Sequence, residues 1–387
     1  MNEGAAAESI LDFLTAENPK IRHGDAKSAS LTKVRNSFWP RQVKRWEGFS
    51  FASLKSAFGG RLIEEAQRKC SSLKYPTFLA GVDDFVYDEP TTTAVVTTWN
   101  HGIVKASLHA VQETLHPSTW VHSARDPQGK PASLTVSTTI RKRKAGAVQR
   151  LKPDAGAVSL CQNCAFQVER LPKDYKPANK WQSSSLSFEG ATSTTGKWSS
   201  GEARRNEVRP IRQVYTYCVQ FGCRYGCIIT TREAFIFRIK PRIKASGAIP
   251  RGHGKMKALK KALATNGLME YVSIPWEKPG PDGLTMNLAL WFVHVLAGNG
   301  HAVDWDYEDL KSATLATETC PLGSATESSE VGPAFDELES LHSRSSSRSS
   351  SVSRKRGRSC DPGDEPNYSF AIVTDSFNTQ VMSCVLC

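Results

Sequence analysis

Two carboxylates and one lysine stand at a spacing suited to metal-assisted hydrolysis of phosphodiesters. Asp154 follows a proline, and nineteen residues separate it from Asp174, which lies two positions before Lys176. Mg²⁺ or Mn²⁺ prefers oxygen ligands, and a metal-bound water can become the attacking nucleophile. A nearby ammonium can orient that water or stabilise charge on the phosphoryl oxygens. We therefore expect Asp154 and Asp174 to be metal ligands, and Asp154, Asp174 and Lys176 to be catalytic.

The segments that contain these residues are predicted to form two neighbouring strands. Residues 155–160 (AGAVSL) and 165–176 (AFQVERLPKDYK) are rich in strand-forming residues. Asp154 opens the first segment and Asp174 lies at the end of the second, so adjacent strands would bring both carboxylates to one edge of a sheet. Residues 174 and 176 are two positions apart and share a face. Lys173 is expected either to compete with the charge of the metal or to bind a phosphate.

The surrounding pattern indicates an α/β fold with a mixed sheet. Apolar residues at helical spacing predict one helix before a turn-rich stretch and one after it. Past residue 130, apolar and polar residues alternate as in a strand. Pro210 fits the first turn of a later helix. The expected elements are helices at 60–70 and 101–115 around turn-rich residues 81–93, a strand at 133–143, a helix at 208–221, a hairpin at 225–240, a strand at 269–276 and a buried apolar helix at 284–298.

The chain resembles the PD-(D/E)XK nuclease superfamily in two segments, LKPDAGAVSL at residues 151–160 and LPKDYKPANKW at residues 171–181. Gln213 and Tyr217 match the Q-x-x-x-Y motif of its RecB-like branch, and a spacing of four places them on one helix face. The resemblance implies a restriction-endonuclease-like mixed β-sheet core flanked by helices, with Gln213 and Tyr217 binding substrate. The motif order from about residue 150 to 298 also resembles a lineage-expanded group of uncharacterised fungal proteins.

The same resemblance implies a further acidic residue on a helix before the first core strand. Glu113 lies in the appropriate element by order, whereas Glu64 and Glu65 lie on an earlier helix. The spacing does not choose among the three, and each also fits a solvated charge on a helix surface.

The charge distribution favours a polyanionic partner for most of the chain. The 387 residues carry a net charge of +12, which divides into +19 for residues 1–300 and −7 for residues 301–387. A basic body fits a nucleic-acid partner, with DNA favoured, but it also fits a basic protein without such a partner, and charge alone does not choose between the two. Arg141–Lys144 and the lysines between 255 and 261 would contact phosphates or form solvated surface. Lys180-Trp181 and Lys197-Trp198 would stack on single strands, or their rings would pack.

Three regions follow from composition. Residues 1–130 form a helical or irregular region packing on the core, residues 131–305 the nuclease-like core, and residues 306–387 a Ser/Arg-containing tail expected to be disordered. Four basic residues in the tail predict binding to a nuclear import receptor: Arg354, Lys355, Arg356 and Arg358. We therefore expect a nuclear or cytoplasmic protein, with the nucleus favoured. Residues Cys384–Cys387 match the C-a-a-X pattern of a prenylation site. Because Cys is unusual at the last position of that motif, we favour a chance match.

Several other classes find no support in the sequence. The start has no secretory pattern, and residues 284–298 are too short to span a bilayer. Walker A, H-E-x-x-H and G-x-S-x-G motifs are absent. Two Cys pairs, Cys161 with Cys164 and Cys223 with Cys227, either form a zinc site or remain buried thiols, which we favour. The two functions left are a metal-dependent nuclease and a catalytically inactive nuclease-fold module that binds nucleic acid or protein.

Overall fold

The computed structural model describes residues 8–25, 38–125, 134–136, 149–159, 168–186, 191–242, 253–277 and 283–316. All of these lie in one compact unit, Met1–Phe335. Several predictions concern residues outside the described ranges. They are the basic cluster Arg141–Lys144, the pair Cys161 and Cys164, the import residues 354–358, the rest of the tail from 317 onward, and Cys384–Cys387.

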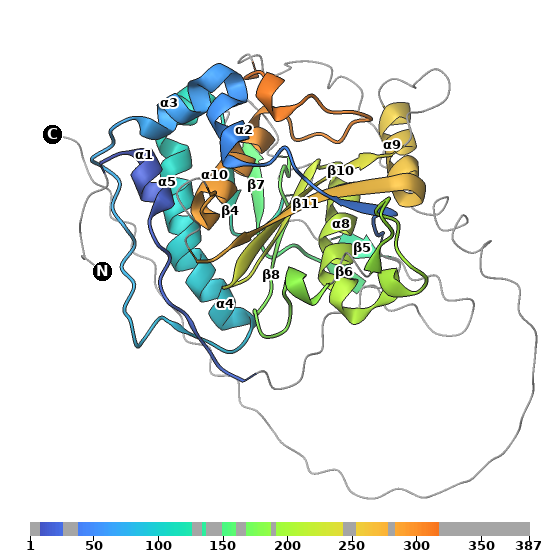
Figure 1. Ribbon diagram of the computed structural model, residues 1–387, viewed down its shortest axis with the longest axis horizontal. Coiled ribbons are helices and arrows are strands. Elements are labelled where there is room, and N and C mark those ends of the chain that lie inside the picture. Colours follow the sequence, from blue (N-terminus) through green and yellow to red (C-terminus); the bar gives the residue numbers. More distant parts are fainter. Residues whose placement is uncertain are drawn as a thin grey trace, which may run out of the picture. The chain divides into compact units, whose positions relative to one another are not determined.

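A five-stranded mixed sheet forms the centre of this unit (Figure 1). Its order is β2 (Gln42–Arg45), β11 (Gly267–Pro275), β10 (Glu233–Pro241), β9 (Tyr225–Ile229) and β8 (Lys173–Tyr175). β10 runs antiparallel to both of its neighbours, whereas the outer strands β8 and β2 run parallel to β9 and β11. The predicted α/β class with a mixed sheet is therefore confirmed.

Helices cover both faces of the sheet because its central strands are apolar on both sides. Alternate residues of a strand point to opposite faces. Cys227, Ile229 and Ile236 belong to one buried cluster, and Ile228 and Phe235 belong to the other. The first cluster includes α5 (Gly102–Ala110) and α10 (Met286–Asn299), and the second includes α8 (Arg209–Phe221) and α9 (His253–Asn266).

The helix α8 connects β8 to its parallel neighbour β9, and its ends follow from sequence. Pro210 occupies the first turn, where its missing N–H costs nothing. Gly222 ends the helix with φ +73°, a left-handed conformation that glycine adopts without strain, and its N–H donates to the carbonyl of Cys218. The helix expected at 208–221 is confirmed.

The predicted hairpin and apolar helix are also confirmed. β9 and β10 pair antiparallel, and Thr230 Oγ1 in the turn accepts the N–H groups of Arg232 and Glu233 at 3.0 Å each. Thr285 caps α10 by accepting the N–H of Leu288, and residues 286–297 are all buried. In the described part of the chain, no helix is long and apolar enough to cross a membrane.

Two further strand pairs lie outside the five-stranded sheet. β4 (Ser118–Val121) pairs antiparallel with β7 (Gly156–Ser159), and β5 (Leu134–Val136) pairs antiparallel with β6 (Gln149–Leu151). The strand beside β7 is thus β4, which the pattern did not predict. The described part of the strand expected at 133–143 pairs with β6 instead.

The N-terminal region contributes short elements, and one of them departs from expectation. α4 (Glu89–Val96) begins inside the stretch 81–93 that was expected to be turn-rich. Asp88 caps it by accepting the N–H of Thr91 at 2.9 Å, and Pro90 lies in its first turn. The other elements are α1 (Ile10–Thr15), β1 (Arg22–His23), α2 (Phe51–Ser56), α3 (Arg61–Gln67), β3 (Phe85–Val86) and α6 (Gln112–Leu115).

Candidate active site

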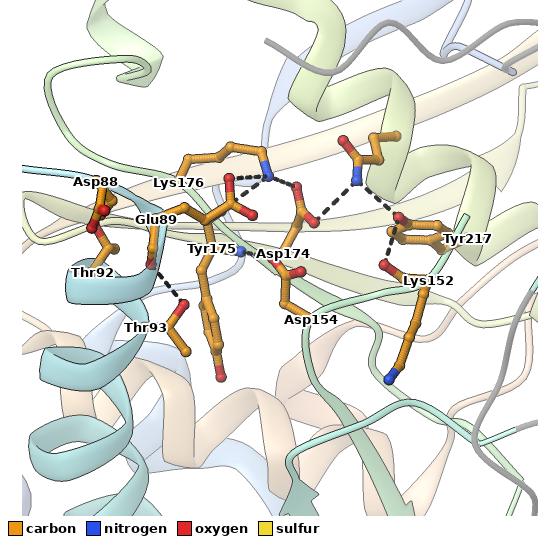
Figure 2. A network of polar contacts seen from close by, with 11 residues as sticks. Asp88, Glu89, Thr92, Thr93, Lys152, Asp154, Asp174, Tyr175, Lys176 and Tyr217 are labelled. Atoms are coloured by element: carbon orange, nitrogen blue, oxygen red, sulfur yellow. Dashed lines mark hydrogen bonds and ion pairs between the residues drawn. The ribbon is translucent and has the colours of Figure 1, made fainter. Parts of the chain in front are cut away.

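The structure brings Asp154 and Asp174 together at the outer strand β8 (Figure 2). Asp154 lies just before β7, and Asp174 is the middle residue of β8. The backbone is joined beside both carboxylates, because Ala155, which follows Asp154, forms an antiparallel bridge with Lys173, which precedes Asp174. The N–H of Tyr175 donates to Asp154 Oδ2 at 2.7 Å. The predicted convergence is present.

Lys176 completes the group. Its Nζ lies 2.5 Å from Asp174 Oδ2 and donates to the carbonyl of Tyr175 at 3.0 Å, and the residue is only 3% exposed. Burial opposes the charge on this ammonium, but the carboxylates of Asp174, Asp154 and Glu89 outweigh burial and raise its pKa above the ordinary value. Lys176 is therefore a cation held beside two carboxylates.

The carboxyl group of Asp154 is the titratable member of the cluster. Burial raises its pKa to about 7, and the negative charge of Asp174 adds to this effect, while Lys176 acts in the opposite direction. Asp154 therefore carries a proton for part of the time at neutral pH. A cation placed between the two carboxylates would favour the loss of that proton.

Gln213 and Tyr217 project from α8 and hold the cluster in place. Gln213 Nε2 donates to Asp174 Oδ1 at 3.2 Å and to Tyr217 Oη at 2.8 Å. Tyr217 Oη donates to the carbonyl of Lys152 at 3.2 Å, which anchors the segment before Asp154. The predicted shared helix face is confirmed. Both side chains are buried, and their contact with substrate stays a prediction.

Glu89 is a third carboxylate that the sequence analysis missed. Its Oε2 lies 3.9 Å from Lys176 Nζ, and its side chain is 46% exposed. Figure 2 shows it at the N-terminal end of α4, facing Lys176. The three acids considered from sequence lie elsewhere: Glu65 pairs with Arg68 at 3.0 Å, and Glu64 and Glu113 are exposed on α3 and α6. The run Asp88-Glu89-Pro90, typical of a helix start, was the available signal.

Lys173 does not face the carboxylates, so the expectation that it competes with a metal or binds phosphate is wrong. Successive residues of β8 point to opposite faces, and the Lys173 side chain enters the protein interior. Its Nζ donates to the carbonyls of Gly156 at 3.1 Å and Leu171 at 3.2 Å, and it lies 4.8 Å from the ring centroid of Trp120.

Glu169 supplies the opposite charge on this interior side. Its buried carboxylate accepts the N–H groups of Ala157 at 2.8 Å, Leu171 at 2.9 Å and Arg125 at 3.1 Å. Burial lowers the pKa of Lys173 to about 8, against the attraction of Glu169. The hydrogen bonds of Lys173 and Glu169 join β7 to the residues before β8 and so fix the backbone from which Asp154 and Asp174 project.

The donors at this edge fit a hard dication. Asp154 and Asp174 offer carboxylate oxygens whose mutual repulsion a cation relieves, and Mg²⁺ commonly binds to one or two carboxylates while keeping several waters. Over the described ranges, no group of three or more His, Cys, Asp or Glu side chains is arranged to hold a metal. The ion would therefore depend on water and substrate for its remaining ligands.

The cysteines and tryptophans that suggested other sites have structural roles. Cys223 and Cys227 are buried free thiols, and Cys223 Sγ donates to the carbonyl of Glu169. Trp181 is 2% exposed and donates to the carbonyl of Glu207, and Trp198 Nε1 donates to the carbonyl of Pro40. The packing alternative therefore holds for both rings.

Comparison with known proteins adds no functional assignment. No protein-family model matches the chain, and neither a curated protein nor a solved structure does. The chemistry of the β8 edge and the motifs that it contains therefore carry the argument for function.

Proposed function

We propose that the chain is a metal-dependent, nuclease-like protein of the PD-(D/E)XK fold that hydrolyses phosphodiester bonds in nucleic acid, with DNA favoured. The observation that carries the proposal is the convergence of the half-buried Asp154 with the buried Asp174 and Lys176 in one cluster that Gln213 of α8 contacts. These residues come from three separate segments of the chain, so their meeting in space supports the resemblance more strongly than spacing alone.

The order of elements around the cluster supports the finer fold class. α5 is followed by the antiparallel pair β4 and β7, by β8, by the crossover helix α8 and by β9. The bridge between Ala155 and Lys173 links β7 to β8. With β5 and β6 inserted between β4 and β7, these elements form a succession of helix, three strands, helix and strand, which supports the core that the resemblance implies.

Each residue of the cluster has a role in the proposed reaction. A bound Mg²⁺ or Mn²⁺ would supply an activated water and charge stabilisation. Asp154 and Asp174 would hold the ion, and Gln213 keeps the Asp174 carboxylate oriented through its hydrogen bond. Lys176 would orient the attacking water and stabilise negative charge on the phosphoryl oxygens, a task suited to its fully protonated ammonium.

A catalytically inactive module that binds nucleic acid or protein is the second candidate. A specific contact favours it: the Lys176 ammonium lies 2.5 Å from Asp174 Oδ2 and so neutralises that carboxylate without any metal. Under this alternative the cluster is a buried ion pair that stabilises the sheet edge.

A cleavage assay separates the two functions. End-labelled single-stranded and duplex DNA, and RNA, are incubated with full-length protein in Mg²⁺, in Mn²⁺ or in EDTA. We expect divalent-dependent cleavage that falls by at least roughly 100-fold in Asp154→Ala and in Lys176→Ala. Glu113→Gln, an exposed carboxylate on α6, is the matched control and leaves cleavage unchanged.

The contradicting outcomes are equally definite. Cleavage that persists in a folded Asp154→Ala/Lys176→Ala double variant rules out the proposed active site. Binding without cleavage, independent of divalent ions, supports the inactive module.

A further inference from the structure

The exposed large apolar side chains of the described residues gather in one short segment. They are Leu79, Val82, Phe85 and Tyr87, which are 47%, 71%, 46% and 50% exposed. Apolar groups concentrated in this way on a surface mark a binding site more often than a scattered few do. The segment leads directly into α4, and Tyr87 precedes the site carboxylate Glu89 by two positions.

The two aromatic rings of the segment, Phe85 and Tyr87, lie close to each other on the surface. Val86 of β3 is buried, so Phe85 and Tyr87 on either side of it face outward together. Their ring centroids lie 5.9 Å apart. Gly24 follows β1, the parallel partner of β3, and lies directly beneath Phe85 and Tyr87. A Cβ at this position would lie 2.9 Å from Phe85 Cζ and 3.2 Å from Tyr87 Cβ. A larger residue at position 24 would therefore press against the Phe85 ring and the Tyr87 Cβ.

Gly24 is also connected to the chain segment that follows Lys176 of the candidate active site. Asn179 Nδ2 donates to the carbonyl of Gly24 at 2.9 Å, and Asn179 lies in the segment that follows Lys176. An open groove along α4 begins at Glu89, and Pro90, Thr93, Ala94, Thr97 and Thr98 line the rest of it. Glu89 thus lines the groove, lies 3.9 Å from Lys176 Nζ and follows Tyr87 by two positions.

Several charged side chains near the rings make hydrogen bonds within the protein. Arg22 makes two hydrogen bonds to the Asp84 carboxylate, Nε to Oδ2 at 3.0 Å and a terminal nitrogen to Oδ1 at 2.8 Å. Its guanidinium carbon lies 5.8 Å from the Phe85 ring centroid, and its side chain is 59% exposed. Asp88 caps α4, and Asp83 accepts the N–H of Leu79. These contacts restrain the nearby aspartates.

We infer that Phe85 and Tyr87 form a platform on which unpaired bases stack, so that the substrate is single-stranded nucleic acid or an unpaired end. The inference rests on the proposed function, because it assigns a substrate class to the same site. Every base presents a π-face to an aromatic ring when it is unpaired and unstacked, whereas a duplex covers those faces. Trp181 and Trp198 are used in packing, whereas Phe85 and Tyr87 are 46% and 50% exposed on the segment that leads into α4.

Fluorescence anisotropy in EDTA tests the platform without interference from cleavage. The probes are a labelled oligothymidylate of about 16 nucleotides and an abasic strand with the same backbone. We expect wild-type protein to bind the oligothymidylate at least roughly tenfold more tightly than the abasic strand. Phe85→Leu/Tyr87→Leu, which keeps apolar surface but removes both rings, abolishes this preference and leaves affinity for the abasic strand unchanged. Leu79→Ala/Val82→Ala is the matched control and retains the preference.

Three results would overturn the platform. They are equal affinity of wild-type protein for both strands, an unchanged preference in the ring variant, and a loss of affinity that is the same for both strands. An unchanged preference would leave the segment as a docking surface for another protein. Because binding is measured without divalent ions, failure of the cleavage assay with an intact base preference would reject the proposed function alone. Cleavage with no base preference would reject the platform alone.

Discussion

The proton on Asp154 links the site to pH at the scale of single residues. Its pKa of about 7 lies above the ordinary value of 3.8, so the folded state binds this proton more tightly than the unfolded state. The contribution of Asp154 to the free energy of unfolding therefore falls as pH rises from about 4 to about 7, and the full cost persists at higher pH.

Asp154→Asn should remove that cost while keeping an acceptor for the N–H of Tyr175. Without divalent ions, we expect the variant to gain thermal stability relative to wild type as pH rises from about 5 to about 8. Thermal unfolding followed by circular dichroism at several pH values provides the measurement. A difference in Tm that is the same at every pH would show that Asp154 does not titrate in this range.

The two lysines of the β8 region should behave in opposite ways. Lys176→Met should abolish divalent-dependent cleavage, because Nζ of Lys176 lies beside Asp174. Lys173→Met should keep cleavage but lower the free energy of unfolding by about 1–3 kcal/mol, because the carbonyls of Gly156 and Leu171 lose a donor. Cleavage rates and urea titrations of both variants test this contrast, and a loss of activity in folded Lys173→Met would contradict it.

At the scale of elements, the contact between β7 and the buried Glu169 carboxylate positions the site. A Cβ on Gly156 would lie in the space of Glu169 Oε2 and 2.8 Å from Ala124 Cα. Gly156→Ala should therefore lower the free energy of unfolding by about 3 kcal/mol, because it displaces a carboxylate that accepts three backbone N–H groups. Gly48→Ala is the control, since a Cβ there makes only ordinary contacts. Equal urea midpoints for the two variants would contradict this account.

The motif-bearing elements could be predicted because their signals are local. β7, α8 and the three-residue β8, which lies at the end of the strand predicted over 165–176, follow from strand-forming runs, from Pro210 and from the spacing of Gln213 and Tyr217. β2 and β4 have four residues each and gain their place from partners distant in sequence, so no local pattern marks them. Short strands of this kind are specified by packing more than by intrinsic propensity.

Two site features could not be predicted for a different reason: each depends on a direction in space. Glu89 belongs to a recognisable helix start, but nothing in the sequence indicates that this helix begins beside Lys176. Lys173 adjoins Asp174 in sequence, yet alternation along β8 sends its side chain to the interior, where Glu169 compensates its charge. Which face of β8 points to the interior is decided by the strands and helices that pack against it, and the sequence does not identify these.

At the scale of the whole molecule, the described body should be sufficient for activity. Its last described segment still packs on the core, since Leu310 is 4% exposed and Ala313 and Leu315 contact the same cluster. Deletion of residues 317–387 should therefore leave divalent-dependent cleavage unchanged. The import prediction for residues 354–358 implies that the same deletion reduces nuclear accumulation of a fluorescent fusion. A deletion variant that folds but does not cleave would place an essential residue in the tail.

The central claim is that Asp154 and Asp174 form a divalent-metal site, and titration calorimetry tests it most directly. Full-length wild-type protein and Asp154→Asn/Asp174→Asn are titrated with Mn²⁺ and Mg²⁺, and circular dichroism confirms that both are folded. We predict binding to wild type that strengthens as pH rises through about 7, because ligand carboxylates must lose their protons, and no binding to the variant. Absence of binding to folded wild-type protein, even with DNA present, or equal binding by the variant, would contradict the account.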